Sequence, residues 1–122
     1  MTLFLSFSAI GQAADMGMIQ LEVTGDPGAA FSGDCRIVSG HKPVKRYRIQ
    51  GKVPAKYWLP GNAVRCSLEK SSLSSRLRAR IIRDEVLEIE QTSVSPFRWL
   101  TVTSSGPWGA AKGSATAARP LW

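Results

Sequence analysis

Residues 76–92 read RLRARIIRDEVLEIEQT, and this stretch decides the fold class. Arg and Glu alternate with apolar side chains on both sides of a polar corner, which is typical of strands with one face in a core and one in solvent. The stretch therefore predicts a β-hairpin. We expect a three-residue loop at 83–85, because a two-residue loop would set charged side chains against apolar ones. The expected register pairs Arg80 with Glu88 and Arg78 with Glu90.

The same alternation runs through most of the chain from residue 18 to residue 103, and no segment keeps the i, i+3, i+4, i+7 spacing of an amphipathic helix. Turns rich in Gly and Pro interrupt it at intervals of about ten residues. The sequence thus predicts an all-β fold, an antiparallel two-sheet sandwich that is immunoglobulin-like in size and has seven or eight short strands. A small closed barrel is the alternative.

Pro54 lies in the stretch from Val53 to Leu59 and demotes it to an edge strand or an extended connector. The same stretch holds Trp58, the one candidate for the buried Trp that antibody domains place between their cysteines. Because its strand carries a proline, we do not predict a true immunoglobulin domain.

Two cysteines, Cys35 and Cys66, each share the apolar face of an alternating stretch. Both sulfurs should point inward on separate strands, so we predict one intrachain disulfide, either between the sheets or between neighbouring strands. Two buried free thiols are the alternative if the chain is not exported. A bond that closes a loop of about 30 residues would contribute roughly 3 to 4 kcal/mol.

The first fourteen residues are apolar, rich in Ala towards their end, and uncharged. They resemble the apolar region of a signal peptide followed by small residues at a processing site, although Lys or Arg is missing before the apolar run. We expect a signal peptide at 1–14, a β-sandwich domain at 15–103 and a disordered Gly/Ala/Ser/Pro tail at 104–122. The expected location is periplasmic or secreted, and a cytosolic chain with an apolar start is the alternative. No transmembrane helix is expected, because the apolar run is far shorter than the roughly 20 residues that a bilayer requires.

The chain carries sixteen Lys and Arg against nine Asp and Glu, a net charge of +7. All sixteen lie from Arg36 onward. Such a surface can attract polyanions, or it can serve solubility alone. The candidate contact residues, for a polyanion or for a partner, are Lys42, Lys45, Arg46, Arg48 and Trp58. Tyr47 and Tyr57 are further stacking candidates, but Tyr57 shares a face with Val53 and Leu59 and is expected in the core.

Two stretches, AVRCSLEK at 63–70 and RLRARIIRDEVLEIEQTS at 76–93, follow a strand that carries the first cysteine. In this order they resemble small exported bacterial β-sandwich domains, such as the extracellular domain of the mycobacterial small membrane-protein family that accompanies lipid transporters. The resemblance covers about half of the chain and is one of strands and turns. It implies a non-catalytic accessory or binding role in the cell envelope.

The sequence shows no constellation for catalysis. His41 is the only histidine and sits in a turn, Glu88 and Glu90 are expected opposite arginines, and no Gly-rich phosphate loop is present. We therefore expect no enzyme, no cofactor and no metal site. Two hypotheses remain. The first is an envelope or secreted interaction domain with a protein partner; the second is a module that binds an anionic polymer, lipid headgroups or carbohydrate through a basic and aromatic face. No specific nucleic-acid motif is present.

Overall fold

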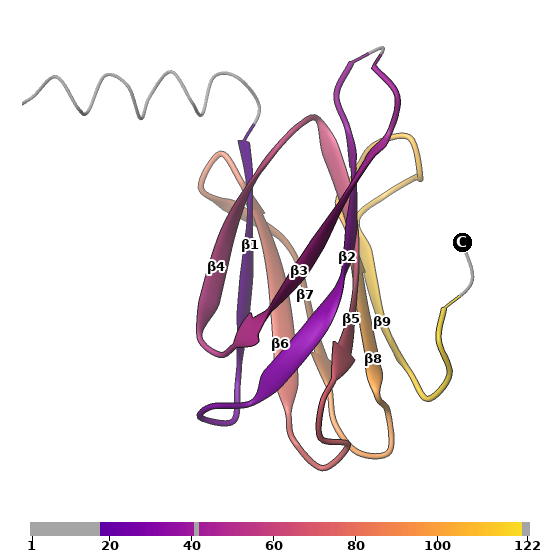
Figure 1. Cartoon of the computed structure of the whole chain (residues 1–122). Helices are drawn as coiled ribbons and strands as arrows, with labels where there is room; N and C mark the ends of the chain where they lie inside the picture. Colours follow the sequence, from indigo (N-terminus) through magenta and orange to yellow (C-terminus); the bar gives the residue numbers. More distant parts are fainter. Residues whose placement is uncertain (1–17, 41, 121–122) are drawn as a thin grey trace, which may run out of the picture.

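The computed structural model describes residues 18–40 and 42–120, which form strands and no helix. Two antiparallel sheets face each other as a sandwich (Figure 1). The first sheet has the order β4-β1-β6-β7 and consists of β1 (Met18–Gly25), β4 (Ala55–Pro60), β6 (Leu77–Arg83) and β7 (Val86–Ser93). The second has the order β3-β2-β5-β8-β9 and consists of β2 (Ala30–Val38), β3 (Lys45–Lys52), β5 (Ala63–Lys70), β8 (Trp99–Thr103) and β9 (Lys112–Thr116). The predicted all-β two-sheet sandwich is confirmed, and the described residues form nine strands rather than seven or eight.

The core lies between the sheets and is filled by the apolar set of each alternating strand. The expected inward residues of β1, β2 and β5 are all buried: Ile19, Leu21, Val23, Phe31, Cys35, Ile37, Val64, Cys66 and Leu68. Tyr57 packs against this core and meets the Phe31 ring edge-on, with ring centroids 6.4 Å apart. Strand β4 is an edge strand that begins just after Pro54, as the proline predicts.

Cys35 and Cys66 form the predicted disulfide. They lie directly opposite each other on β2 and β5, neighbours in the five-stranded sheet, with their Cα atoms 4.0 Å apart. Of the two expected geometries, the bridge between neighbouring strands is therefore the one observed. In this respect the chain differs from antibody domains, where the bridge joins the two sheets.

The β6–β7 hairpin is present, but the predicted register is wrong. Its loop has two residues, Asp84 and Glu85, which both adopt left-handed backbone angles with φ of 52° and 64°. Two successive left-handed residues form a type I′ turn, and the twist of this turn matches the twist of the two strands that it joins. Arg80 consequently lies opposite Glu90 instead of Glu88, and Arg78 lies opposite Thr92 instead of Glu90.

A β-bulge in β7 sets the apolar residues of β6 opposite the apolar residues of β7, which a two-residue loop without a bulge would not do. Ile82 pairs with Leu87 and Ile81 pairs with Ile89, so Glu88 is the extra residue of β7. Such a bulge re-aims the side chain of its additional residue. A comparison of loop lengths alone predicts the wrong register, because it does not allow for a bulge.

The expected disorder of residues 104–122 is also wrong for most of that stretch. Strand β9 pairs with β8 along its whole length and forms the last strand of the five-stranded sheet. Its small residues suit this place, because a Cβ on Gly113 would lie 2.7 Å from the Cβ of Gln91 on β7. Backbone pairing with β8 and close packing against Gln91 hold β9 in place. Neither requires alternating apolar residues, so a search for alternation does not find this strand.

The expected leader at 1–14 lies outside the described residues, and so does His41. In residues 18–40 and 42–120 there is no helix of the length and apolarity that crossing a membrane requires.

Candidate functional site

The outer face of the five-stranded sheet carries a line of cations that runs across the strands. Arg36 on β2 lies directly opposite Arg46 on β3 and directly opposite Arg65 on β5. The line continues through Thr103 on β8 to Lys112 on β9. We call Arg46, Arg36, Arg65 and Lys112 the cationic row. It spans four strand spacings, or about 19 Å.

This arrangement gathers positive charge along one line of the sheet. Like charges placed directly opposite each other on one face of an antiparallel pair repel each other, and Arg36 has an arginine on both sides. Residues that break a local rule of folding in this way are often kept for function. The cationic row is therefore the leading candidate for a binding surface.

Trp108 stands beside the row on a tight turn. Gly106 and Gly109 exchange two backbone hydrogen bonds of 3.0 Å, which leaves Pro107 and Trp108 at the tip. The Arg65 guanidinium lies over the Trp108 ring, 5.4 Å from its centroid. Such a stack orients the guanidinium while leaving its charge intact.

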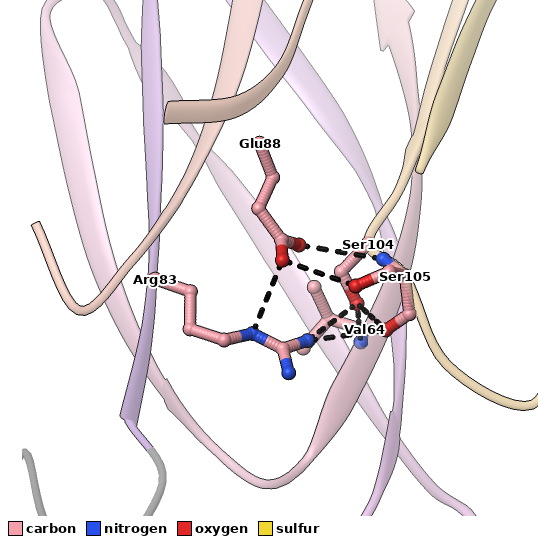
Figure 2. A network of polar contacts seen from close by, with 5 residues as sticks. All are labelled: Val64, Arg83, Glu88, Ser104 and Ser105. Carbon is pink, nitrogen blue, oxygen red and sulfur yellow. Dashed lines mark hydrogen bonds and ion pairs between the residues drawn. The ribbon is translucent and has the colours of Figure 1, made fainter. Parts of the chain in front are cut away.

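The Trp108 turn is anchored at its base by a polar cluster between the sheets (Figure 2). The bulged residue Glu88 accepts hydrogen bonds from the backbone N of Ser105 at 3.3 Å and from its Oγ at 3.1 Å, and it forms an ion pair with Arg83 at 3.5 Å. Ser104 exchanges hydrogen bonds with the backbone of Val64, and Arg83 donates to the Ser104 hydroxyl at 3.3 Å. The bulge thus serves to fix the segment that presents Trp108.

The two rows next to the cations carry hydroxyls together with charges of both signs. One row runs from Arg48 through Asp34 to Ser67, Thr101 and Ser114, and the next from Gln50 through Ser32 and Glu69 to Trp99 and Thr116. Arg119 lies over the Trp99 ring, 5.7 Å from its centroid. The hydroxyl side chains are concentrated on β5, β8 and β9.

The outer face of the four-stranded sheet has a different charge pattern, because carboxylates lie between its cations. Glu22 pairs with Lys56 and Arg80, each at 3.7 Å, and Glu90 pairs with Arg78 at 3.4 Å and with Arg80 at 3.3 Å. These exposed pairs contribute little stability. They do reduce the positive charge of this face, so the two outer faces of the sandwich differ in their electrostatics.

The structure separates the contact residues that the sequence suggested. Arg46 and Arg48 share the outer face of β3, whereas Lys45 and Tyr47 belong to its opposite face and Lys42 lies in the loop before it. Trp58 is 57% exposed, but it lies on β4, on the outer face of the other sheet opposite Gln20. The five residues therefore do not form one surface.

The residues that sequence reasoning missed are Arg36, Arg65, Lys112 and Trp108. A signal for two of them was present, because Arg36 follows Cys35, whereas Arg65 precedes Cys66. In an antiparallel pair that sets the two cysteines opposite each other, these arginines must also be opposite. The sequence leaves open whether the disulfide lies within one sheet or between the sheets. Only a disulfide within one sheet places the two arginines opposite each other.

Lys70 is a second feature that the sequence did not indicate. Its side chain is fully buried at the end of β5. Its ammonium donates to the carbonyls of Leu73 at 3.1 Å, Ser75 at 2.8 Å and Ser93 at 3.5 Å. Burial, and secondarily the charge of Arg98, lowers the pKa of Lys70, while Asp26 acts in the opposite direction. Lys70 joins two loops at one end of the sandwich.

Across the two described ranges, no three side chains of His, Cys, Asp or Glu come together as metal ligands would. Comparison with known proteins gave no match to any family model, any curated protein or any solved structure. The resemblance to exported bacterial β-sandwich domains therefore stays a prediction.

Proposed function

We propose that this chain is an exported, non-catalytic binding domain that holds an anionic glycan on the outer face of its five-stranded sheet. The cationic row carries the proposal, because three arginines lie side by side on adjacent strands and Lys112 extends the line to the far edge. A linear polyanion laid across the strands would meet one cation after another. It would also relieve the repulsion among them.

The surroundings of the row favour a sugar polymer over a nucleic acid. Hydroxyls of Thr101 and Ser114 lie in the adjacent row and can exchange hydrogen bonds with sugar hydroxyls. Single-stranded nucleic acids require open aromatic platforms for their bases. Trp99 and Trp108 are only partly exposed, and each is covered on one side by an arginine.

Two observations support the export part of the proposal. The Cys35–Cys66 bond is typical of proteins in oxidising compartments, and the apolar start of the chain resembles a signal sequence. The proposed location is periplasmic or secreted, where anionic envelope and extracellular polysaccharides are available ligands.

Retention on immobilised heparin, used as a model anionic glycan, tests the proposal with a matched pair of variants. Arg46→Ser/Lys112→Ser removes two exposed cations from the ends of the row. Lys42→Ser/Lys45→Ser removes the same charge from exposed positions outside it. We expect the wild type and the second variant to be retained at physiological salt. The row variant should elute earlier, with the slope of log K against log salt reduced by about 1 to 2.

Two results would contradict the proposal. Elution of the wild type at low salt would mean that the chain does not bind polyanions at physiological salt. Equal weakening by both variants would mean that only net charge matters. Single-stranded DNA of equal charge belongs in the same series, because tighter binding to DNA than to heparin would replace the glycan by a nucleic acid.

Docking onto a protein partner remains the second candidate. Leu73, Val94 and Phe97 are exposed apolar side chains on the two loops that Lys70 joins. A partner bound there would be insensitive to the cationic row. A cross-linked complex of defined mass that is lost in Phe97→Ser and kept in Arg46→Ser/Lys112→Ser would favour this candidate.

A further inference from the structure

A pocket of about 180 Å³ opens on the outer face at the β9 end of the cationic row. Its walls include two cations, Arg65 and Lys112, and three hydroxyl side chains, Thr101, Thr103 and Ser114. These residues come from three neighbouring strands, β5, β8 and β9. The volume is many times what one water molecule needs, so the pocket has room for a small hydrated anion.

One of the two cations in the walls of this pocket, Arg65, is held in place before any ligand arrives. The Arg65 Nε donates to the Thr103 hydroxyl at 3.4 Å, and the guanidinium lies over the Trp108 ring. The polar cluster around Glu88 in turn fixes the base of the Trp108 turn (Figure 2). A site whose donors are positioned in advance loses less entropy on binding.

A neighbouring pocket of about 150 Å³ on the same face provides an internal comparison. It includes Arg48 and Arg119, but also the carboxylates Asp34 and Glu69. Its charges can compensate one another within the pocket. The walls of the Arg65–Lys112 pocket contain no carboxylate among the described residues that line it.

We propose that the Arg65–Lys112 pocket binds one tetrahedral oxyanion, a sulfate or phosphate group carried by the glycan. This inference rests on the proposed function and gives it a substrate class. A guanidinium, an ammonium and the hydroxyls of Thr101 and Ser114 supply more donors than the two oxygens of a carboxylate can engage. A sulfate or phosphate ester offers three terminal oxygens to the same set. The pocket therefore selects sulfated or phosphorylated sugars over uronic acids.

Amide chemical shifts of Gly113 and Ser114 report directly on the pocket, since β9 forms one of its walls. We expect saturable shifts on titration with inorganic sulfate and inorganic phosphate at low ionic strength, and no saturable shift with acetate. Glucose 6-sulfate and glucose 6-phosphate form two further arms. The sugar ester that binds more tightly identifies which ester the natural glycan carries.

A pair of variants separates the pocket from the charge of the face. Thr101→Val/Ser114→Ala removes two hydroxyls and no charge, and should weaken sulfate binding about tenfold while the slope of log K against log salt for heparin, which reports charge contacts, stays unchanged. Ser72→Ala/Ser74→Ala removes two hydroxyls from an exposed loop and should leave both unchanged.

The outcomes for the pocket and for the proposed function can be told apart. Heparin binding that depends on the row, combined with equal shifts for sulfate and acetate or with full sulfate affinity in Thr101→Val/Ser114→Ala, overturns the oxyanion pocket alone. Heparin binding that is independent of the row overturns the proposed function, whatever sulfate does.

Discussion

At the scale of single residues, Lys70 shows how a buried charge can serve the fold. Lysine is rarely fully buried unless its ammonium is paired, and here three backbone carbonyls accept from it. We expect Lys70→Met to lower the free energy of unfolding by about 1 to 3 kcal/mol, because these carbonyls lose their donor. Urea denaturation measures the change. Lys52→Met, at the exposed end of β3, is the control, and equal stability of the two variants would contradict this role.

The lowered pKa of Lys70 gives a pH dependence of defined sign. The unfolded chain keeps the Lys70 proton up to about pH 10.5, whereas the folded chain releases it at lower pH. The unfolded state therefore binds more protons between the two pKa values, and the Lys70 contribution to stability rises with pH across that window. We expect the wild type to gain stability relative to Lys70→Met as the pH approaches 10.5. A constant difference in the free energy of unfolding from pH 7 to pH 10.5 would contradict a lowered pKa.

Two arginines of the candidate site, Arg36 and Arg65, could be predicted from the sequence once the cysteines are paired. Each borders a cysteine, so the disulfide register dictates that Arg36 and Arg65 meet. The suggested set instead came from the run around Lys45 and Arg46, in which neighbours in sequence alternate between faces. Proximity along a strand is a poor guide to a shared surface, because successive side chains point to opposite sides.

At the scale of elements, the β6–β7 turn offers the sharpest test of the register. Asp84 and Glu85 both hold positive φ, which costs residues other than Gly and Asn stability. We expect Asp84→Asn/Glu85→Gly, the sequence preferred in two-residue hairpin turns, to raise the free energy of unfolding by about 1 kcal/mol. Thermal unfolding would detect this as a higher Tm. A lower Tm would contradict a loop with two left-handed residues at Asp84 and Glu85.

Alternation predicted that β1, β2, β5 and β6 form strands and which face each of them buries, because their inward apolar residues are all buried. It could not predict β9, whose small residues are held by pairing with β8 and by close contact with Gln91. Nor could it predict the bulge at Glu88, since one extra residue changes the register without changing the composition. Both omissions affect the candidate site, because β9 supplies Lys112 and the bulge anchors the Trp108 turn.

At the scale of the whole molecule, the sandwich presents two outer faces of different character. Glutamates lie between the cations of the four-stranded sheet, whereas arginines are cross-strand neighbours in the five-stranded sheet. The net charge of +7 does not reveal this division. The division depends on the order of the strands in each sheet, which local sequence does not encode.

The most direct test of the account is the map of amide chemical shift changes when a short heparin oligosaccharide is titrated into the 15N-labelled protein at physiological salt. We predict that the changes concentrate on β3, β2, β5, β8 and β9, with the largest near the cationic row, while β1, β4 and β6 stay unaffected. Changes spread evenly over both sheets, or confined to the four-stranded sheet, would contradict a binding face built on the cationic row.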